Sequence, residues 1–133
     1  MKKILAYRFS AFGDVAMTVP VIREFLEQNP NVEFIMVSRD SFQDLFNGLP
    51  RCTFYGIDFE EYKGFWGMNK LSKILIKNFT PDYIADLHDV IRSKILNIIF
   101  TRRGFNVYKI DKGKEEKKLL TDIRNLNKYP LKM

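Results

Sequence analysis

The sequence has few of the residues on which redox and metal chemistry depend. It contains one cysteine, one histidine and one tryptophan among 133 residues. A single cysteine cannot form an internal disulfide, and Cys52 stands in an apolar run typical of a strand, which predicts a buried, reduced thiol rather than a nucleophile. One histidine and one cysteine are too few soft ligands for a zinc-type site. We therefore expect neither a metal centre nor another cofactor.

Long apolar runs and glycine-rich loops are also missing. No stretch approaches the roughly 18 apolar residues of a membrane span. Arg8 and Ser10 interrupt the apolar run near the N-terminus, so it lacks the continuous core of a secretory signal. These features predict a cytoplasmic location, which includes the inner face of the cytoplasmic membrane. The sequence contains no phosphate-binding loop of the G-x-G-x-x-G or Walker type.

What is present is the composition of a soluble globular protein, with 46% hydrophobic and 29% charged residues. Its length predicts one domain. Lysine and arginine outnumber aspartate and glutamate by 22 to 16, and the formal charge of +6 suits a negatively charged partner such as a nucleotide, a phosphorylated sugar or an anionic membrane. The basic residues are dispersed without a nucleic-acid-reading motif, so we expect no nucleic-acid partner.

Short apolar segments alternate with helical periodicity along the chain. This alternation predicts an α/β fold, a Rossmann-like doubly wound parallel sheet of about five strands in the order 3-2-1-4-5. The aromatic segment 59–67 is interpreted as a mobile loop whose rings either anchor it to the domain or stack on sugars. Strands are expected over residues 3–9, 32–37, 52–57, 83–86 and 106–110, and helices over 15–28, 41–46, 70–78, 91–102 and 115–124.

Asp14 stands where the first predicted strand gives way to a helix. In an open parallel sheet, ligands bind along the edge formed by the carboxyl ends of the strands. Asp14 is therefore a candidate catalytic carboxylate, although aspartate is also among the best N-cap residues and its carboxylate can simply accept from helical N–H groups. Gly13 before it either supplies an unusual backbone angle or allows another backbone to come close.

The predicted strand order brings a second loop to the same edge. His88 and Arg92 follow the fourth predicted strand, and the ends of strands 1 and 4 would be neighbours. His88 is either a ligand-binding side chain or a turn residue that hydrogen-bonds locally. Arg92 is either a solvated residue of a first helical turn or, because a cation there opposes the helix dipole, a contact for an anionic ligand.

Three segments together resemble the glycosyltransferase family 9 proteins, the lipopolysaccharide heptosyltransferases. The first is Arg-Phe-Ser-x-x-Gly-Asp-Val-x-x-Thr-x-Pro over residues 8–20. The second runs from Pro81 to His88 and continues with Arg92-Ser93, and the third is Lys-Ile-Asp-Lys-Gly over residues 109–113. The matches follow the order of the family and extend over nearly all of the chain.

The resemblance implies an inverting transferase that moves a heptose or similar sugar from a nucleotide-diphosphate donor to a lipopolysaccharide-core acceptor. It implies Asp14 as the base that deprotonates the acceptor hydroxyl. It further implies donor binding by Ser10 and Gly13, and acceptor binding by His88, Arg92 and Lys112. Peripheral association with the inner membrane would accompany such an acceptor.

The family's enzymes have two Rossmann-like domains, the GT-B arrangement. Residues 1–133 correspond to the N-terminal, acceptor-side domain, and the C-terminal donor-binding domain is missing from the resemblance. We therefore expect this chain alone, as a fragment or truncated product, to be inactive as a transferase. The alternative is a non-catalytic module that binds a phosphorylated saccharide or a nucleotide, and a phosphoacceptor domain is disfavoured because no other carboxylates surround Asp14.

Overall fold

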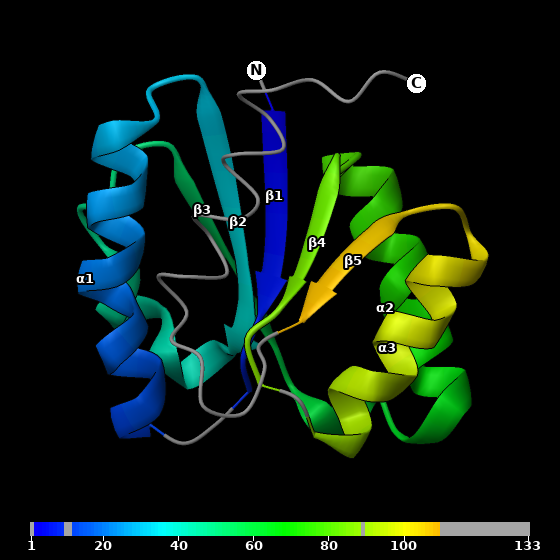
Figure 1. Ribbon diagram of the computed structural model, residues 1–133. Helices are drawn as coiled ribbons and strands as arrows, with labels where there is room; N and C mark the ends of the chain where they lie inside the picture. The colour runs from blue at the N-terminus through cyan, green and yellow to red at the C-terminus, as the bar shows by residue number, and fades with distance from the viewer. Residues whose placement is uncertain (1, 10–11, 89, 110–133) are drawn as a thin grey trace.

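The computed structural model describes residues 2–9, 12–88 and 90–109, which form a parallel sheet with helices on both faces (Figure 1). The sheet has five strands in the order β3-β2-β1-β4-β5. Both the predicted α/β Rossmann-like class and the predicted strand order are confirmed. The strands are β1 (Lys2–Tyr7), β2 (Val32–Arg39), β3 (Cys52–Ile57), β4 (Tyr83–Asp86) and β5 (Asn106–Lys109).

The central strand β1 explains why the sheet forms around it. Its last four residues, Ile4 to Tyr7, are all buried. A continuous apolar run of this kind suits a strand covered on both faces, as parallel strands are. β1 pairs with β2 from Lys2↔Val32 to Tyr7↔Val37 and with β4 from Ile4↔Tyr83 to Tyr7↔Asp86.

One face of the sheet is covered by helix α1 (Phe12–Gln28) and the 3-10 helix η1 (Asp40–Phe46). Buried residues of α1, including Val15, Ile22 and Leu26, pack against alternate side chains of β1 and β2. The predicted helix 15–28 therefore exists and extends back to Phe12, and the predicted helix 41–46 is a 3-10 helix.

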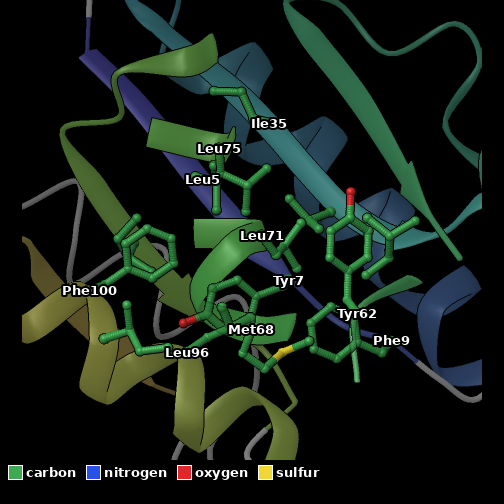
Figure 2. Close-up of a cluster of buried hydrophobic side chains, with 14 residues drawn as sticks. Leu5, Tyr7, Phe9, Ile35, Tyr62, Met68, Leu71, Leu75, Leu96 and Phe100 are labelled. Carbon is green, nitrogen blue, oxygen red and sulfur yellow. The ribbon is translucent and has the colours of Figure 1, made fainter. Parts of the chain in front are cut away.

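Helices α2 (Gly64–Phe79) and α3 (Ile91–Arg102) cover the opposite face (Figure 1). Met68, Leu71 and Leu75 of α2 pack on Leu5 and Ile35 of the sheet (Figure 2). Toward the carboxyl edge of the sheet the cluster becomes aromatic, with Tyr7 stacked on Phe9 at 5.8 Å between ring centroids.

The prediction of a mobile loop over residues 59–67 is wrong. This segment contains the 3-10 helix η2 (Phe59–Glu61) and the first turn of α2, which begins six residues before the predicted Lys70. Gly67 makes the corner possible, because a Cβ there would lie 2.3 Å from the carbonyl carbon of Tyr62. Phe59 and Tyr62 anchor the segment, whereas Phe65 and Trp66 are exposed.

Helix α3 matches its predicted bounds, and the predicted helix 115–124 lies outside the described residues. Leu96 and Phe100 of α3 are fully buried, while Ile98 is exposed. Within residues 2–9, 12–88 and 90–109, no helix combines the length and the apolar character needed to cross a membrane.

Candidate active site

The loops that follow β1 and β4 lie side by side at the carboxyl edge of the sheet. Tyr7 and Asp86 are register partners at the ends of these strands, and the Leu87 N–H donates to the Tyr7 carbonyl at 3.1 Å. The ladder thus continues one residue past the paired strands. As a result, the residues that follow Tyr7 face those that follow Asp86.

Arg8 connects three elements at this edge. Its Nη2 lies 3.2 Å from Oδ2 of Asp14 in the first turn of α1, and its Nη1 donates to the Leu87 carbonyl after β4. The Arg8 side chain is largely buried, while that of Asp14 is 60% exposed. Within the described residues, the partner of the Asp14 carboxylate is Arg8 rather than a helical N–H, so the capping interpretation is not supported.

The imidazole of His88 contacts the neighbouring loop, whereas its backbone N–H is held within its own turn. The Phe9 N–H donates to His88 Nδ1 at 3.3 Å, across 79 residues of sequence. Burial and the nearby Arg8 guanidinium lower the pKa of His88 below its usual 6.5, against the opposite effect of Asp86 and Asp14. The lowered pKa favours the neutral imidazole at neutral pH, and in that form the accepting Nδ1 leaves the proton on Nε2.

A buried polar chain supports the His88 loop from below. Asp86 is fully buried, and its Oδ1 accepts from the His88 N–H at 2.9 Å. Its Oδ2 accepts from Asn97 Nδ2 at 2.8 Å, and Asn97 Oδ1 accepts from the Tyr7 hydroxyl. Burial and the charge of Asp86 raise the pKa of Tyr7 well above 10, so the hydroxyl remains a donor.

Three arginines gather around the aromatic side of this edge, and we call Arg8, Arg39 and Arg92 the arginine cluster. The guanidinium carbons of Arg39 and Arg92 lie 4.6 and 4.2 Å from the centroid of the Phe59 ring. Arg39 Nε also donates to the Phe9 carbonyl at 2.9 Å. The cluster concentrates positive charge next to His88 and Asp14, an arrangement suited to an anionic ligand.

Of the residues predicted for the site, Asp14, His88 and Arg92 belong to this edge, with Asp14 and His88 joined through Arg8 and Phe9. Gly13 precedes Asp14, has no left-handed φ, and a Cβ there would meet no atom of the described residues within 4 Å. It therefore provides neither the unusual angle nor the close backbone approach that were predicted. Ser10 and Lys112 lie outside the described residues.

Four contributors were not assigned a role from the sequence: Arg8, Arg39, Asp86 and Asn97. Arg8 and Asp86 lie within the segments that resemble family 9. An ionisable residue at the end of a buried strand indicates a candidate functional site, so both could have been predicted. Arg39 and Asn97 carry no such signal, because their roles depend on side chains brought from other elements.

The thiol and metal predictions concern other parts of the molecule. Cys52 is half-buried in β3, and burial raises the pKa of its thiol to about 11. The thiolate that would act as a nucleophile is therefore scarce at neutral pH. In the part of the chain that the structure describes, no group of three or more histidine, cysteine, aspartate or glutamate side chains is arranged to hold a metal ion.

No protein-family model matches the sequence, and no curated protein matches it significantly. Solved structures do match in fold. A glycosyl transferase family 9 protein from Veillonella parvula superposes with a TM-score of 0.68 at 18% identity, covering 93% of this chain and 41% of that one. The chain shares the fold of a family 9 glycosyltransferase.

Two further structures show how widely this fold is used. The E. coli heptosyltransferase WaaC, solved with ADP, gives a TM-score of 0.61 at 17% identity, over 90% of this chain and 38% of WaaC. A UDP-N-acetylglucosamine 2-epimerase gives 0.57 at 14% identity, over 98% and 46%. The chain thus spans less than half the length of each. Since a transferase and an epimerase share the architecture, the reaction must be argued from the site.

Proposed function

We propose that this chain is the N-terminal, acceptor-side domain of an inverting glycosyltransferase. In this proposal it helps to transfer a heptose or similar sugar from a nucleotide-diphosphate donor to a phosphorylated lipopolysaccharide-core acceptor. The observation that carries the proposal is the Arg8–Asp14 pair, an exposed carboxylate oriented at the carboxyl edge where β1 and β4 meet. The chain also shares its fold with the heptosyltransferase WaaC, which has been solved with ADP and with ADP-2-deoxy-2-fluoro heptose. This likeness supports the same assignment.

Asp14 acts as the general base. Its carboxylate takes the proton of the acceptor hydroxyl while that oxygen forms a bond to the anomeric carbon from the face opposite the leaving group. The bond between the anomeric carbon and the diphosphate oxygen breaks, and the nucleoside diphosphate leaves with the electron pair. Attack from the opposite face inverts the anomeric configuration. Arg8 orients the carboxylate, whose 60% exposure leaves it accessible to the hydroxyl.

His88 and Arg92 bind the acceptor. As a neutral imidazole with its proton on Nε2, His88 serves as a hydrogen-bond donor to a hydroxyl or phosphate oxygen. Arg92 supplies a fixed positive charge whose guanidinium is held against Phe59, and such a group binds phosphate through paired hydrogen bonds. Lys112 is assigned to the acceptor, and Ser10 to the donor phosphates, by the resemblance alone.

Among the residues that the structure describes, Gly13 is the one assigned to binding the donor. The open space over its Cα lets a donor phosphate approach the first turn of α1, whose N–H groups favour anions. The remaining contacts to the nucleotide come from a second, donor-binding domain. A transferase of this kind acts in the cytoplasm at the inner face of the membrane, where its acceptor is anchored.

The proposal is tested by an assay of sugar transfer. The assay measures the nucleoside diphosphate that is released from ADP-heptose in the presence of a phosphorylated core acceptor. We expect no turnover from the 133-residue chain alone, and turnover when it is joined to the donor-binding domain of a family 9 enzyme. Asp14→Asn should abolish that turnover, whereas Asp44→Asn, which alters an exposed carboxylate of η1, should not. Turnover by the chain alone, or retained by Asp14→Asn, contradicts the proposal.

A second function is favoured by the arginine cluster. Because this cluster and His88 do not need Asp14 to attract an anion, the domain is equally suited to capture a phosphorylated saccharide or nucleotide without catalysis. Binding that survives Asp14→Asn, in a protein that shows no transfer even with a donor domain, is the result that distinguishes this function.

A further inference from the structure

The two helical layers of the domain carry opposite charge. In α1 and η1 the only basic residue is Arg23, against the five acidic residues Asp14, Glu24, Glu27, Asp40 and Asp44. Helices α2 and α3 contain no acidic residue at all. Their basic residues are Lys70, Lys73, Lys77, Arg92, Lys94 and Arg102. Since these helices lie on opposite faces of the sheet (Figure 1), the helices on one face, α1 and η1, are mainly acidic and the helices on the other, α2 and α3, are basic.

The basic charge forms a stripe along α2. Trp66, Lys70, Lys73 and Lys77 are spaced by four, three and four residues, which places them on one side of the helix, and all four are exposed. Together with Phe65 we call these residues the α2 stripe. Lys77 favours the helix by lying in its last turn. Lys70 lies 5.9 Å from the centroid of the Tyr62 ring. Neither Lys70 nor Lys73 is in the last turn, and like charges at this spacing repel, so helix stability does not explain the row of lysines as a whole.

The stripe ends in exposed aromatic side chains. Trp66 is 80% and Phe65 52% exposed, and their rings contact each other edge to face at 5.9 Å. Neighbouring exposed aromatic rings rimmed by charged side chains are typical of a protein or membrane interaction site. Ile98 of α3 is also exposed on this layer, beside a hollow of about 410 Å³ that is lined by Asn97, Ile98, Thr101, Arg102 and Val107.

We propose that the α2 stripe docks the domain on a lipid bilayer with anionic headgroups. Lysines above the bilayer attract those headgroups, and tryptophan and phenylalanine insert at the interface between headgroups and acyl chains. A nucleic acid fits less well, because the Phe65 and Trp66 rings are inclined by 83° and offer no common platform for successive bases. α2 begins soon after η2, whose Phe59 contacts the arginine cluster, so the aromatic end of the stripe is the end nearest the candidate active site.

This inference rests on the membrane association included in the proposed function, but its test needs no sugar substrate. The probes are vesicles of phosphatidylcholine, with and without phosphatidylglycerol. Trp66 is the only tryptophan of the chain, so its emission reports insertion directly. We expect a blue shift with the anionic vesicles, a much smaller one with the neutral vesicles, and release of the protein by added salt.

Matched variants assign the binding to the stripe. Each Lys→Gln change at Lys70, Lys73 or Lys77 should weaken partitioning, measured by co-sedimentation, by about fivefold, since one lysine contributes about 1 kcal/mol at an anionic surface. Arg23→Gln removes the same charge from the opposite layer and should have no effect. Trp66→Ala should also weaken binding, whereas Met17→Ala, which shortens a side chain 71% exposed on α1, should not.

Circular dichroism of each variant separates lost docking from lost folding. The proposal is overturned if the wild-type chain shows no blue shift, if Arg23→Gln weakens binding as much as Lys73→Gln, or if the chain binds a single-stranded oligonucleotide but no vesicle. If the chain binds vesicles but, joined to a donor-binding domain, transfers no sugar, the docking proposal stands and the proposed transferase function is wrong. If the joined protein transfers sugar but the chain binds no vesicles, the transferase function stands and the docking proposal is wrong.

Discussion

The Arg8 guanidinium joins the Asp14 carboxylate to the end of β4, because its two terminal nitrogens reach different elements. One lies 3.2 Å from Asp14 Oδ2, and the other donates to the Leu87 carbonyl. The position of Asp14 therefore depends on β4 as well as on its own helix. This contact gives the two halves of the candidate active site a common support.

The same contact predicts that Asp14 matters more to function than to stability. Its side chain is 60% exposed, and exposed ion pairs contribute at most about 1 kcal/mol, so Asp14→Asn should lower the free energy of unfolding by less than that. Arg8→Met should cost about 1–3 kcal/mol, because it also leaves the Leu87 carbonyl without this donor. Urea unfolding of both variants measures the difference. An Asp14→Asn variant less stable than Arg8→Met would show that the pair is mainly structural.

The buried carboxylate of Asp86 should be far more sensitive. Its two oxygens accept from different N–H groups, so the amide of Asp86→Asn must present an NH₂ group to one of these donors. We expect a loss of about 2 kcal/mol in the free energy of unfolding. Asp44→Asn, the same chemical change at an exposed site, is the control and should cost almost nothing. Equal midpoints for the two variants in urea would exclude the buried chain as a support of the His88 loop.

The pH dependence of stability should show the titration of His88. Because the pKa of His88 is below 6.5 in the folded protein and near 6.5 in the unfolded one, the unfolded state binds more protons between these two values. The contribution of His88 is thus fully present above pH 6.5 and is lost as the pH falls through the folded pKa. His88→Gln should remove this part of the profile.

Proton NMR gives the folded pKa of His88 without an assignment problem, since it is the only histidine. A ring titration midpoint at or above 6.5 would contradict burial and Arg8 as the dominant influences on its pKa.

Two glycines should respond in opposite directions to the same change. Gly67→Ala should destabilise the protein by about 1–3 kcal/mol, because the new methyl group would overlap the Tyr62 backbone. Gly13→Ala should stabilise it by up to about 1 kcal/mol, since alanine favours the helix and the added Cβ meets no neighbour. Thermal unfolding measures both. Similar losses from the two changes would contradict the packing described for η2 and α2.

The class and topology of the fold were predictable because they depend on local patterns. Short apolar runs such as Ile4 to Tyr7 identified the strands, and the order 3-2-1-4-5 followed from their alternation with helices. The start of α2 was missed, because Gly64 and Gly67 suggested a loop. Gly67 in fact serves a close approach to Tyr62 that is visible only in three dimensions.

The site was predictable in part for the same reason. Asp14, His88 and Arg92 follow strand ends, and the topology brings those ends to one edge. The pairing of Asp14 with Arg8 and the gathering of Arg39 and Arg92 on Phe59 depend on side chains from separate elements. No spacing in the sequence encodes such contacts.

The most direct test of the central claim is a map of ligand contacts on the ¹⁵N-labelled chain by NMR. A phosphorylated heptose is added as the acceptor probe, and unphosphorylated heptose as the control. If the carboxyl edge is the acceptor side of a transferase, the phosphorylated sugar should shift the amide signals of Phe9, Asp14, His88 and Arg92, with weaker shifts from the control. Asp14→Asn should leave this binding intact. Shifts confined to other surfaces, or equal shifts with both sugars, would contradict the account.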